Sequence, residues 1–123
     1  MFKYGILIIG ITMLVVFPAF AADQTDVIIT RVISSVENNR PVSVYIDDVR
    51  IGTLMPGRRL EIRVNNGSHT ISAKITPKNN KDIMGDYYFT ADDTKTLKLR
   101  INVEEEGVLL LKKTVIYITE LED

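Results

Sequence analysis

Apolar and polar residues alternate along most of the chain after its N-terminal segment. In the clearest stretch, Leu60, Ile62 and Val64 alternate with Glu61 and Arg63, which is typical of a strand with one buried and one solvated face. Similar stretches rich in β-branched residues recur and predict about eight strands. The predicted strands span residues 26–36, 42–46, 49–54, 60–64, 70–75, 86–91, 94–103 and 108–118.

Short turn signals separate these strands. Asn65-Asn66-Gly67 predicts a hairpin, because Asn and Gly tolerate the positive φ angles of primed turns. Asp47-Asp48 predicts another tight turn, and the polar segment 76–85 is the longest expected loop. Because no helical period follows the N-terminal segment, we predict an all-β fold, an antiparallel β-sandwich of seven to eight strands in preference to a barrel.

The N-terminal segment has a different pattern. Lys3 precedes an apolar run at residues 5–17, and small residues follow at Ala19, Ala21 and Ala22. This order predicts a secretory signal peptide over residues 1–21, cleaved after Ala21 or, as second choice, after Ala22. The run has 13 residues, whereas a membrane-spanning helix needs about 20. We therefore expect a periplasmic or secreted protein with no transmembrane segment in its mature chain.

The expected mature chain, residues 22–123, is close to neutral and forms one domain. The whole chain has 15 Lys and Arg against 16 Asp and Glu, and cleavage removes Lys3. Nucleic acid is not an expected partner, since its binding needs a strongly basic face. The chain has no Cys and a single His, which argues against disulfides and against a zinc site. We expect no cofactor.

His69, the only His, is the first candidate for chemistry. It shares strand parity with Ile71, so we expect a half-buried side chain at the edge of the core in preference to a catalytic base. Asp47-Asp48 and Asp92-Asp93 could bind calcium, but Asp is a common turn residue and no D-x-D-x-D-G loop is present. Without a G-x-S-x-G motif either, we predict no catalytic residue, no metal site and no enzyme activity.

Two groups of side chains are candidate recognition surfaces. One is a basic cluster, because guanidinium groups can bind carboxylates or phosphates through paired hydrogen bonds; it contains Arg58, Arg59 and Arg63. Glu61 lies between two of these, so an ordinary solvated face is the alternative. The other group is Tyr87 and Tyr88, which must point to opposite faces of a strand and can anchor a sugar or a protein.

The last predicted strand, residues 108–118, is strongly apolar. Its three consecutive leucines cannot all face one side of a sheet. The strand is therefore either central and buried on both faces, or an edge that pairs with something beyond the domain.

Residues 41–75 resemble the PEGA-type β module and the related small domain of bacterial envelope lipoproteins. The matching residues are Val42-x-Val44-Tyr45-Ile46-Asp47-Asp48-x-x-Ile51-Gly52-x-Leu54 and Gly67-Ser68-His69-Thr70-Ile71. The resemblance implies a β-sandwich-like fold and an envelope setting, and it implies no catalytic residues.

Three hypotheses follow. The leading one is an exported, non-enzymatic β-sandwich module of the bacterial cell envelope that binds or scaffolds an envelope protein or a cell-wall glycan. The alternative is a structural subunit that assembles by β-strand addition, as pilus or adhesin subunits do, which would make it a homo-oligomer. A small hydrolase is the third.

Overall fold

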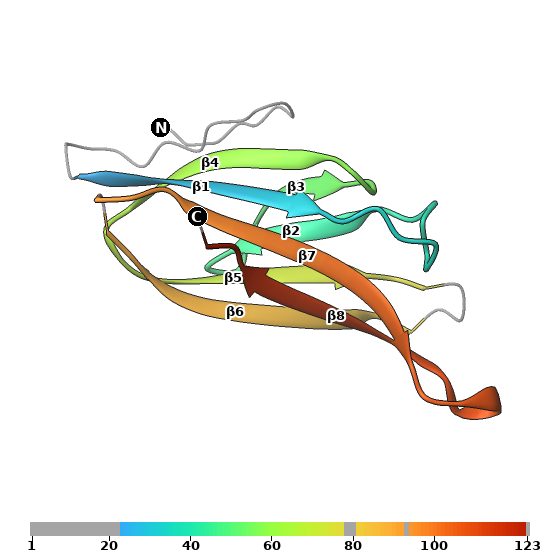
Figure 1. Cartoon of the computed structure of the whole chain (residues 1–123). Helices are drawn as coiled ribbons and strands as arrows, with labels where there is room; N and C mark the ends of the chain where they lie inside the picture. The colour runs from blue at the N-terminus through green and yellow to red at the C-terminus, as the bar shows by residue number, and fades with distance from the viewer. Residues whose placement is uncertain (1–22, 78–80, 93, 123) are drawn as a thin grey trace.

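The computed structural model describes residues 23–77, 81–92 and 94–122, and these form the predicted all-β sandwich (Figure 1). The predicted signal peptide, residues 1–21, lies outside the described residues. The described part contains no helix long and apolar enough to cross a membrane. Its strands are β1 (Gln24–Arg31), β2 (Val42–Ile46), β3 (Val49–Leu54), β4 (Arg59–Asn65), β5 (Gly67–Ile75), β6 (Ile83–Ala91), β7 (Leu97–Glu106) and β8 (Lys113–Glu120), with a 3-10 turn, η1 (Leu109–Leu111), before β8.

The strands form two sheets of four. Their orders are β4-β1-β7-β8 and β3-β2-β5-β6. β1 runs parallel to β7, and the other described pairings are antiparallel. The predicted antiparallel sandwich is therefore confirmed, apart from this one parallel pair.

The core lies between the two sheets and is built from alternate positions of their strands. In β7, Leu97, Leu99, Ile101 and Val103 are buried, while the residues between them are more exposed. In β2, Val42, Val44 and Ile46 are buried in the same way. The period of two in the sequence therefore decides which side of each strand packs into the core.

One buried position at the end of β1 is occupied by a charged residue. Arg31 is 1% exposed, and its guanidinium donates hydrogen bonds to the backbone carbonyls of Glu37, Arg40 and Leu54 at 3.0, 2.5 and 3.0 Å. Burial lowers the pKa of this guanidinium. These bonds fasten the irregular segment after β1 to the end of the sandwich.

The two lateral sides of the sandwich differ. On one side the edge strands β6 and β8 pack together, and a Cβ on Gly85 would lie 2.9 Å from the carbonyl oxygen of Ile116. On the other side the edge strands β3 and β4 barely touch. The sandwich is thus closed along β6 and β8 and open along β3 and β4.

Several predicted boundaries were wrong. The predicted strand 26–36 ends at Arg31, and the predicted loop 76–85 is shorter because β6 begins at Ile83. The predicted strand 108–118 begins only at Lys113, since Leu109–Leu111 form the turn η1. β8 is an edge strand, so the interpretation of a central strand is also wrong.

Candidate binding groove

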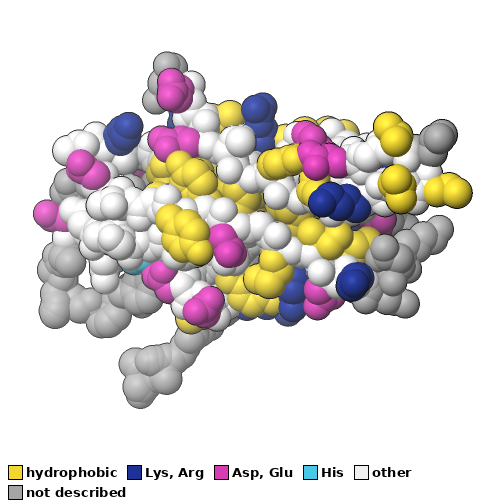
Figure 2. Space-filling view, turned by 90° about the horizontal axis from the view of Figure 1, so that it is seen from below, with side chains coloured by type: hydrophobic (Ala, Val, Ile, Leu, Met, Phe, Trp, Pro, Cys, Tyr) yellow, Lys and Arg dark blue, Asp and Glu magenta, His cyan; other side chains and the backbone are white. Residues whose placement is uncertain are grey.

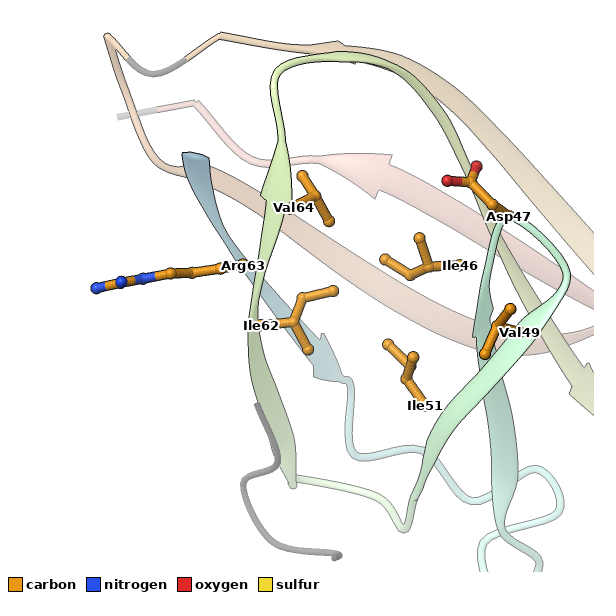
Figure 3. A pocket seen from close by; sticks show the side chains of 7 residues that line it. All are labelled: Ile46, Asp47, Val49, Ile51, Ile62, Arg63 and Val64. Carbon is orange, nitrogen blue, oxygen red and sulfur yellow. The ribbon is translucent and has the colours of Figure 1, made fainter. Parts of the chain in front are cut away.

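The open side of the sandwich contains an apolar groove between β3 and β4. Figure 3 shows the side chains that line it, which are Ile46, Val49, Ile51, Ile62 and Val64, with Asp47 and Arg63 at its margins. The cavity has a volume of about 110 Å³. We call this feature the β3–β4 groove.

The alternation within each strand places these side chains in the groove. Ile62 and Val64 share one parity in β4, and Val49 and Ile51 share one in β3, so both pairs point into the space between the sheets (Figure 3). Ile51 and Ile62 are buried, but Val49 is 62% exposed. Arg63 has the other parity and points away from the groove (Figure 3).

The turn at one end of the groove has the backbone that the sequence predicts. Asp47 and Asp48 have φ angles of 48° and 69°, the left-handed values of a two-residue primed hairpin turn. The Asp47 carboxylate accepts a hydrogen bond from the backbone N–H of Thr70 at 2.9 Å. Its other oxygen lies 2.6 Å from Nδ1 of His69. Burial raises the pKa of Asp47, but the bonds from His69 and Thr70, with the positive charge of His69, bring it below its ordinary value.

His69 joins this turn to the next one. Its Nε2 lies 2.6 Å from the backbone carbonyl oxygen of Asn65, while its Nδ1 faces the Asp47 carboxylate. Each ring nitrogen therefore has an oxygen acceptor beside it, the Asp47 carboxylate on one side and the Asn65 carbonyl on the other. The ring also packs against Phe89, with centroids 5.7 Å apart. His69 is thus half-buried and ties two turns together.

The predicted basic cluster lies on and before β4, away from the groove interior. Arg59 pairs with Glu61 at 2.7 Å, and Arg63 pairs with Asp26 at 3.0 Å; all four side chains are more than half exposed. Exposed pairs of this kind contribute little stability and exchange partners easily. Arg58 is also exposed, in the turn that precedes β4.

The predicted aromatic group lies on β6, on the closed side of the sandwich. Tyr88 is 73% exposed. Tyr87 is half-buried, stacks on Phe89 and donates a hydrogen bond to Glu120 at 2.7 Å. Because β4 and β6 are edges of different sheets on opposite sides, the structure does not bring the tyrosines and the arginines together.

The acid pairs belong to turns. Asp92 accepts a hydrogen bond from the backbone N–H of Thr94 at 2.9 Å, while Asp93 lies outside the described residues. Among the residues that the structure describes, no three His, Cys, Asp or Glu side chains are grouped so that they could hold a metal ion.

Sequence reasoning missed the most exposed apolar feature. The hairpin between β7 and β8 ends in Val108, Leu110 and Leu111, which are all exposed, and Leu110 is 98% exposed. The signal in the sequence is an apolar run directly after Gly107, between three acidic and two basic residues. Such a run at a hairpin tip cannot reach the core of its own domain.

Comparisons with known proteins found no match for this chain, neither a family model, nor a curated protein, nor a solved structure. Its function is therefore inferred from its own residues and geometry.

Proposed function

We propose that this protein is a non-enzymatic binding or scaffolding module of the bacterial cell envelope, and that it takes up an apolar segment of a protein partner in the β3–β4 groove. The observation that carries the proposal is the exposure of Val49 directly above buried Ile51 and Ile62. Binding is favourable when an aliphatic side chain of a partner covers such an apolar surface and removes it from water.

The chemistry of the groove favours a protein over a glycan. Its lining side chains are aliphatic, with one acidic and one basic residue at the margins. Sugar rings bind to aromatic faces and to polar groups that can meet their hydroxyls. An apolar peptide side chain needs neither and fits the aliphatic lining.

The backbone of the groove also suits a protein partner. β3 pairs only with β2, and β4 pairs only with β1, among the described strands. Each therefore has one edge at which backbone N–H and C=O groups can meet another chain. The envelope setting rests on the predicted signal peptide, residues 1–21, and on the resemblance of residues 41–75 to envelope modules.

The proposal can be tested by photo-crosslinking inside cells. A photoreactive phenylalanine analogue placed at Val49 reports on the groove, and the same analogue at Met84, an exposed apolar residue of β6, is the matched control. We expect position 49 to give a discrete product in which residue 49 is attached to an apolar peptide segment, identified by mass spectrometry of the digest. Position 84 should not give this product.

Two results would contradict the proposal. One is the same set of products from both positions, and the other is a product from position 49 that a muramidase digests. The second result would assign the groove to a cell-wall glycan instead.

A further inference from the structure

The β7–β8 hairpin carries an apolar surface of its own, the apolar tip, which consists of Val108, Leu110 and Leu111. In Figure 1 this hairpin projects beyond the rest of the sandwich, and Figure 2 shows hydrophobic side chains gathered at the projecting end. A monomeric domain rarely exposes several aliphatic side chains together unless they meet a partner.

The tip has a defined shape. The backbone N–H of Leu111 donates a hydrogen bond to the carbonyl of Val108 at 2.9 Å, and Gly107 enters the turn with a φ of 109°. Below the tip, the Tyr117 hydroxyl donates a hydrogen bond to Glu106 across the two strands. The leucines are therefore presented on an ordered turn, which reduces the entropy lost on binding.

The tip and the β3–β4 groove lie toward opposite ends of the sandwich. Ile62 pairs with Val27, which pairs with Leu97 at the start of β7, and Val64 lies two pairings further in the same direction, opposite Thr25. The tip follows the other end of β7, which is 10 residues long. Ten strand residues span about 30 Å, so the tip of a molecule cannot fill its own groove.

The sizes of the tip and the groove match. The groove has a volume of about 110 Å³. An engineered apolar cavity of about 150 Å³ in a protein core stays dry and binds small apolar molecules, so a groove of this order accommodates one aliphatic side chain. Leu110, exposed almost completely, is the side chain at the tip best placed to enter it.

The charges beside the two surfaces are also complementary. The acidic segment 104–106 precedes the tip, and Lys112 and Lys113 follow it. Beside the groove, the Asp47 carboxylate stands at the β2–β3 turn, and the Arg63 guanidinium projects outward from β4, where it pairs with Asp26; the Asp47 and Arg63 side chains are both about half exposed. Each arm of the hairpin can thus face the opposite charge, which fixes the orientation of the contact.

We infer that the apolar tip of one copy of this chain occupies the β3–β4 groove of a second copy. This inference rests on the proposed function, because it names the occupant of that groove. The contact joins two different surfaces, so it is heterologous and generates open chains or closed rings. It differs from β-strand addition, because a turn and not an extended strand enters the groove.

The same acidic segment argues against a membrane as the binding partner of the tip. Residues 104–106 carry three carboxylates beside two lysines, and anionic lipid surfaces attract basic segments and repel acidic ones. The β3–β4 groove has an aliphatic lining with the exposed Arg63 beside it, so it accepts this hairpin better than an anionic surface does.

Sedimentation velocity of the purified protein over a range of concentrations tests the inference. Leu110→Glu with Leu111→Glu alters the tip, Val49→Glu alters the groove, and Met84→Glu is the control. All four side chains are more than half exposed, so the variants should fold, which circular dichroism verifies. We expect the unaltered protein and the control to associate with rising concentration, and the tip and groove variants to associate about tenfold more weakly or not at all.

Mixing the two defective variants gives the sharpest result. The groove variant still has an intact tip, and the tip variant still has an intact groove, so one of each should form a dimer. Because the remaining surfaces of that dimer are both defective, no larger species should appear. A dimer that stops at two chains is specific to a tip-in-groove contact.

The inference fails if the unaltered protein stays monomeric, if the tip and groove variants associate as it does, or if the mixture gives no dimer. It also fails if phosphatidylcholine vesicles bind the unaltered protein but not the tip variant. Crosslinking at Val49 distinguishes failure of the self-assembly inference from failure of the proposed function. A product with another protein keeps the groove as a binding site but overturns self-assembly, whereas a product with residues 108–113 of a second copy supports both.

Discussion

The imidazole of His69 and the carboxylate of Asp47 lie side by side, with Nδ1 and Oδ2 separated by 2.6 Å, although 22 residues separate them in the chain. Asp47 belongs to the turn between β2 and β3, and His69 lies near the start of β5. Their contact therefore fixes the turn at the end of the β3–β4 groove. The rim of the groove is held in place before any partner binds.

The first prediction concerns the pH dependence of this contact. The pKa of Asp47 is below its ordinary value of 3.8, so the ionised carboxylate is favoured in the folded state. Its stabilising contribution is present above pH 3.8 and is lost as the pH falls through the lowered pKa. Asp47→Asn keeps a residue that tolerates the left-handed turn but removes the charge.

We expect Asp47→Asn to lower the free energy of unfolding by up to about 1 kcal/mol at neutral pH, because the carboxylate is half exposed. The difference from the unaltered protein should vanish once the pH has fallen below the lowered pKa of Asp47. Urea unfolding at the two pH values measures both differences. An equal difference at both would contradict the ionic role of Asp47.

The second prediction concerns the closed side of the sandwich. Gly85→Ala would place a Cβ 2.9 Å from the carbonyl oxygen of Ile116, and that backbone atom cannot move without shifting β8. We expect a loss of about 1–3 kcal/mol in the free energy of unfolding. Gly52→Ala is the control, because its new Cβ would meet only the end of the flexible Leu60 side chain, at 3.2 Å. Similar losses in both variants would show that the β6–β8 contact is not tight.

Much of the fold could be predicted from the alternation of apolar and polar residues, which has a period of two. The alternation of Leu60, Ile62 and Val64 correctly identified the inward face of β4, and Asp47-Asp48 correctly identified a tight turn. These features depend on local chemistry alone: which side chains avoid water, and which residues accept a positive φ. The pairing of β1 with β7 could not be read in this way, since it joins segments far apart in the chain.

Two further features could not be predicted from local patterns either: a charged side chain that is buried and apolar side chains that are exposed. Arg31 shares the parity of Val27 and Ile29, but no sequence pattern predicts that a charged residue is buried there, and only the fold shows three carbonyls converging on its guanidinium. The leucines of η1 read as strand because the run is apolar. The hairpin instead carries Leu110 and Leu111 beyond the sandwich, where no inward face exists.

The β3–β4 groove could not be predicted from the sequence, for a related reason. Val49 is an ordinary inward-facing residue by its pattern. It differs from the core residues because β3 and β4 are edges of different sheets, a property of the strand order. The side chains that were predicted to recognise a partner were chosen by residue type. Residue type alone does not show which apolar surface the rest of the fold leaves uncovered.

The third prediction concerns the buried guanidinium. Arg31→Met fills a similar volume but removes every donor, which leaves the carbonyls of Glu37, Arg40 and Leu54 without this partner. We expect a loss of about 2–4 kcal/mol in the free energy of unfolding. Hydrogen exchange should also accelerate in residues 32–41. Unchanged exchange in that segment would show that Arg31 does not fasten it.

The fourth prediction concerns Tyr87. Burial, and then the hydrogen bond to Glu120 and its negative charge, raise the pKa of Tyr87 from 10.0 to about 12. The neutral phenol is favoured in the folded state, so its contribution to stability is present below pH 10 and is lost as the pH rises through about 12. The ultraviolet absorbance titration of the unaltered protein minus that of Tyr87→Phe isolates this group. A difference curve centred near pH 10 would contradict the bond to Glu120.

The last prediction separates the β3–β4 groove from the recognition surface that residue types suggested. Tyr88 is exposed on β6, on the closed side of the sandwich, whereas Val49 opens onto the other side. Removing an exposed ring should change the free energy of unfolding by no more than about 0.5 kcal/mol. Tyr88→Ala should therefore be neutral for folding.

If a partner binds in the groove, crosslinking from position 49 should also be unchanged in Tyr88→Ala, because the two surfaces share no residue. If Tyr88 is the anchor, the same variant should lose the partner while its fold stays intact, since truncation of an interface tyrosine commonly costs about 2 kcal/mol or more of binding energy. Crosslinking from position 49 and from position 84 of β6, each with and without Tyr88→Ala, therefore decides the side: an unchanged product at position 49 places the partner at the groove, and a product at position 84 alone that Tyr88→Ala abolishes places it at Tyr88.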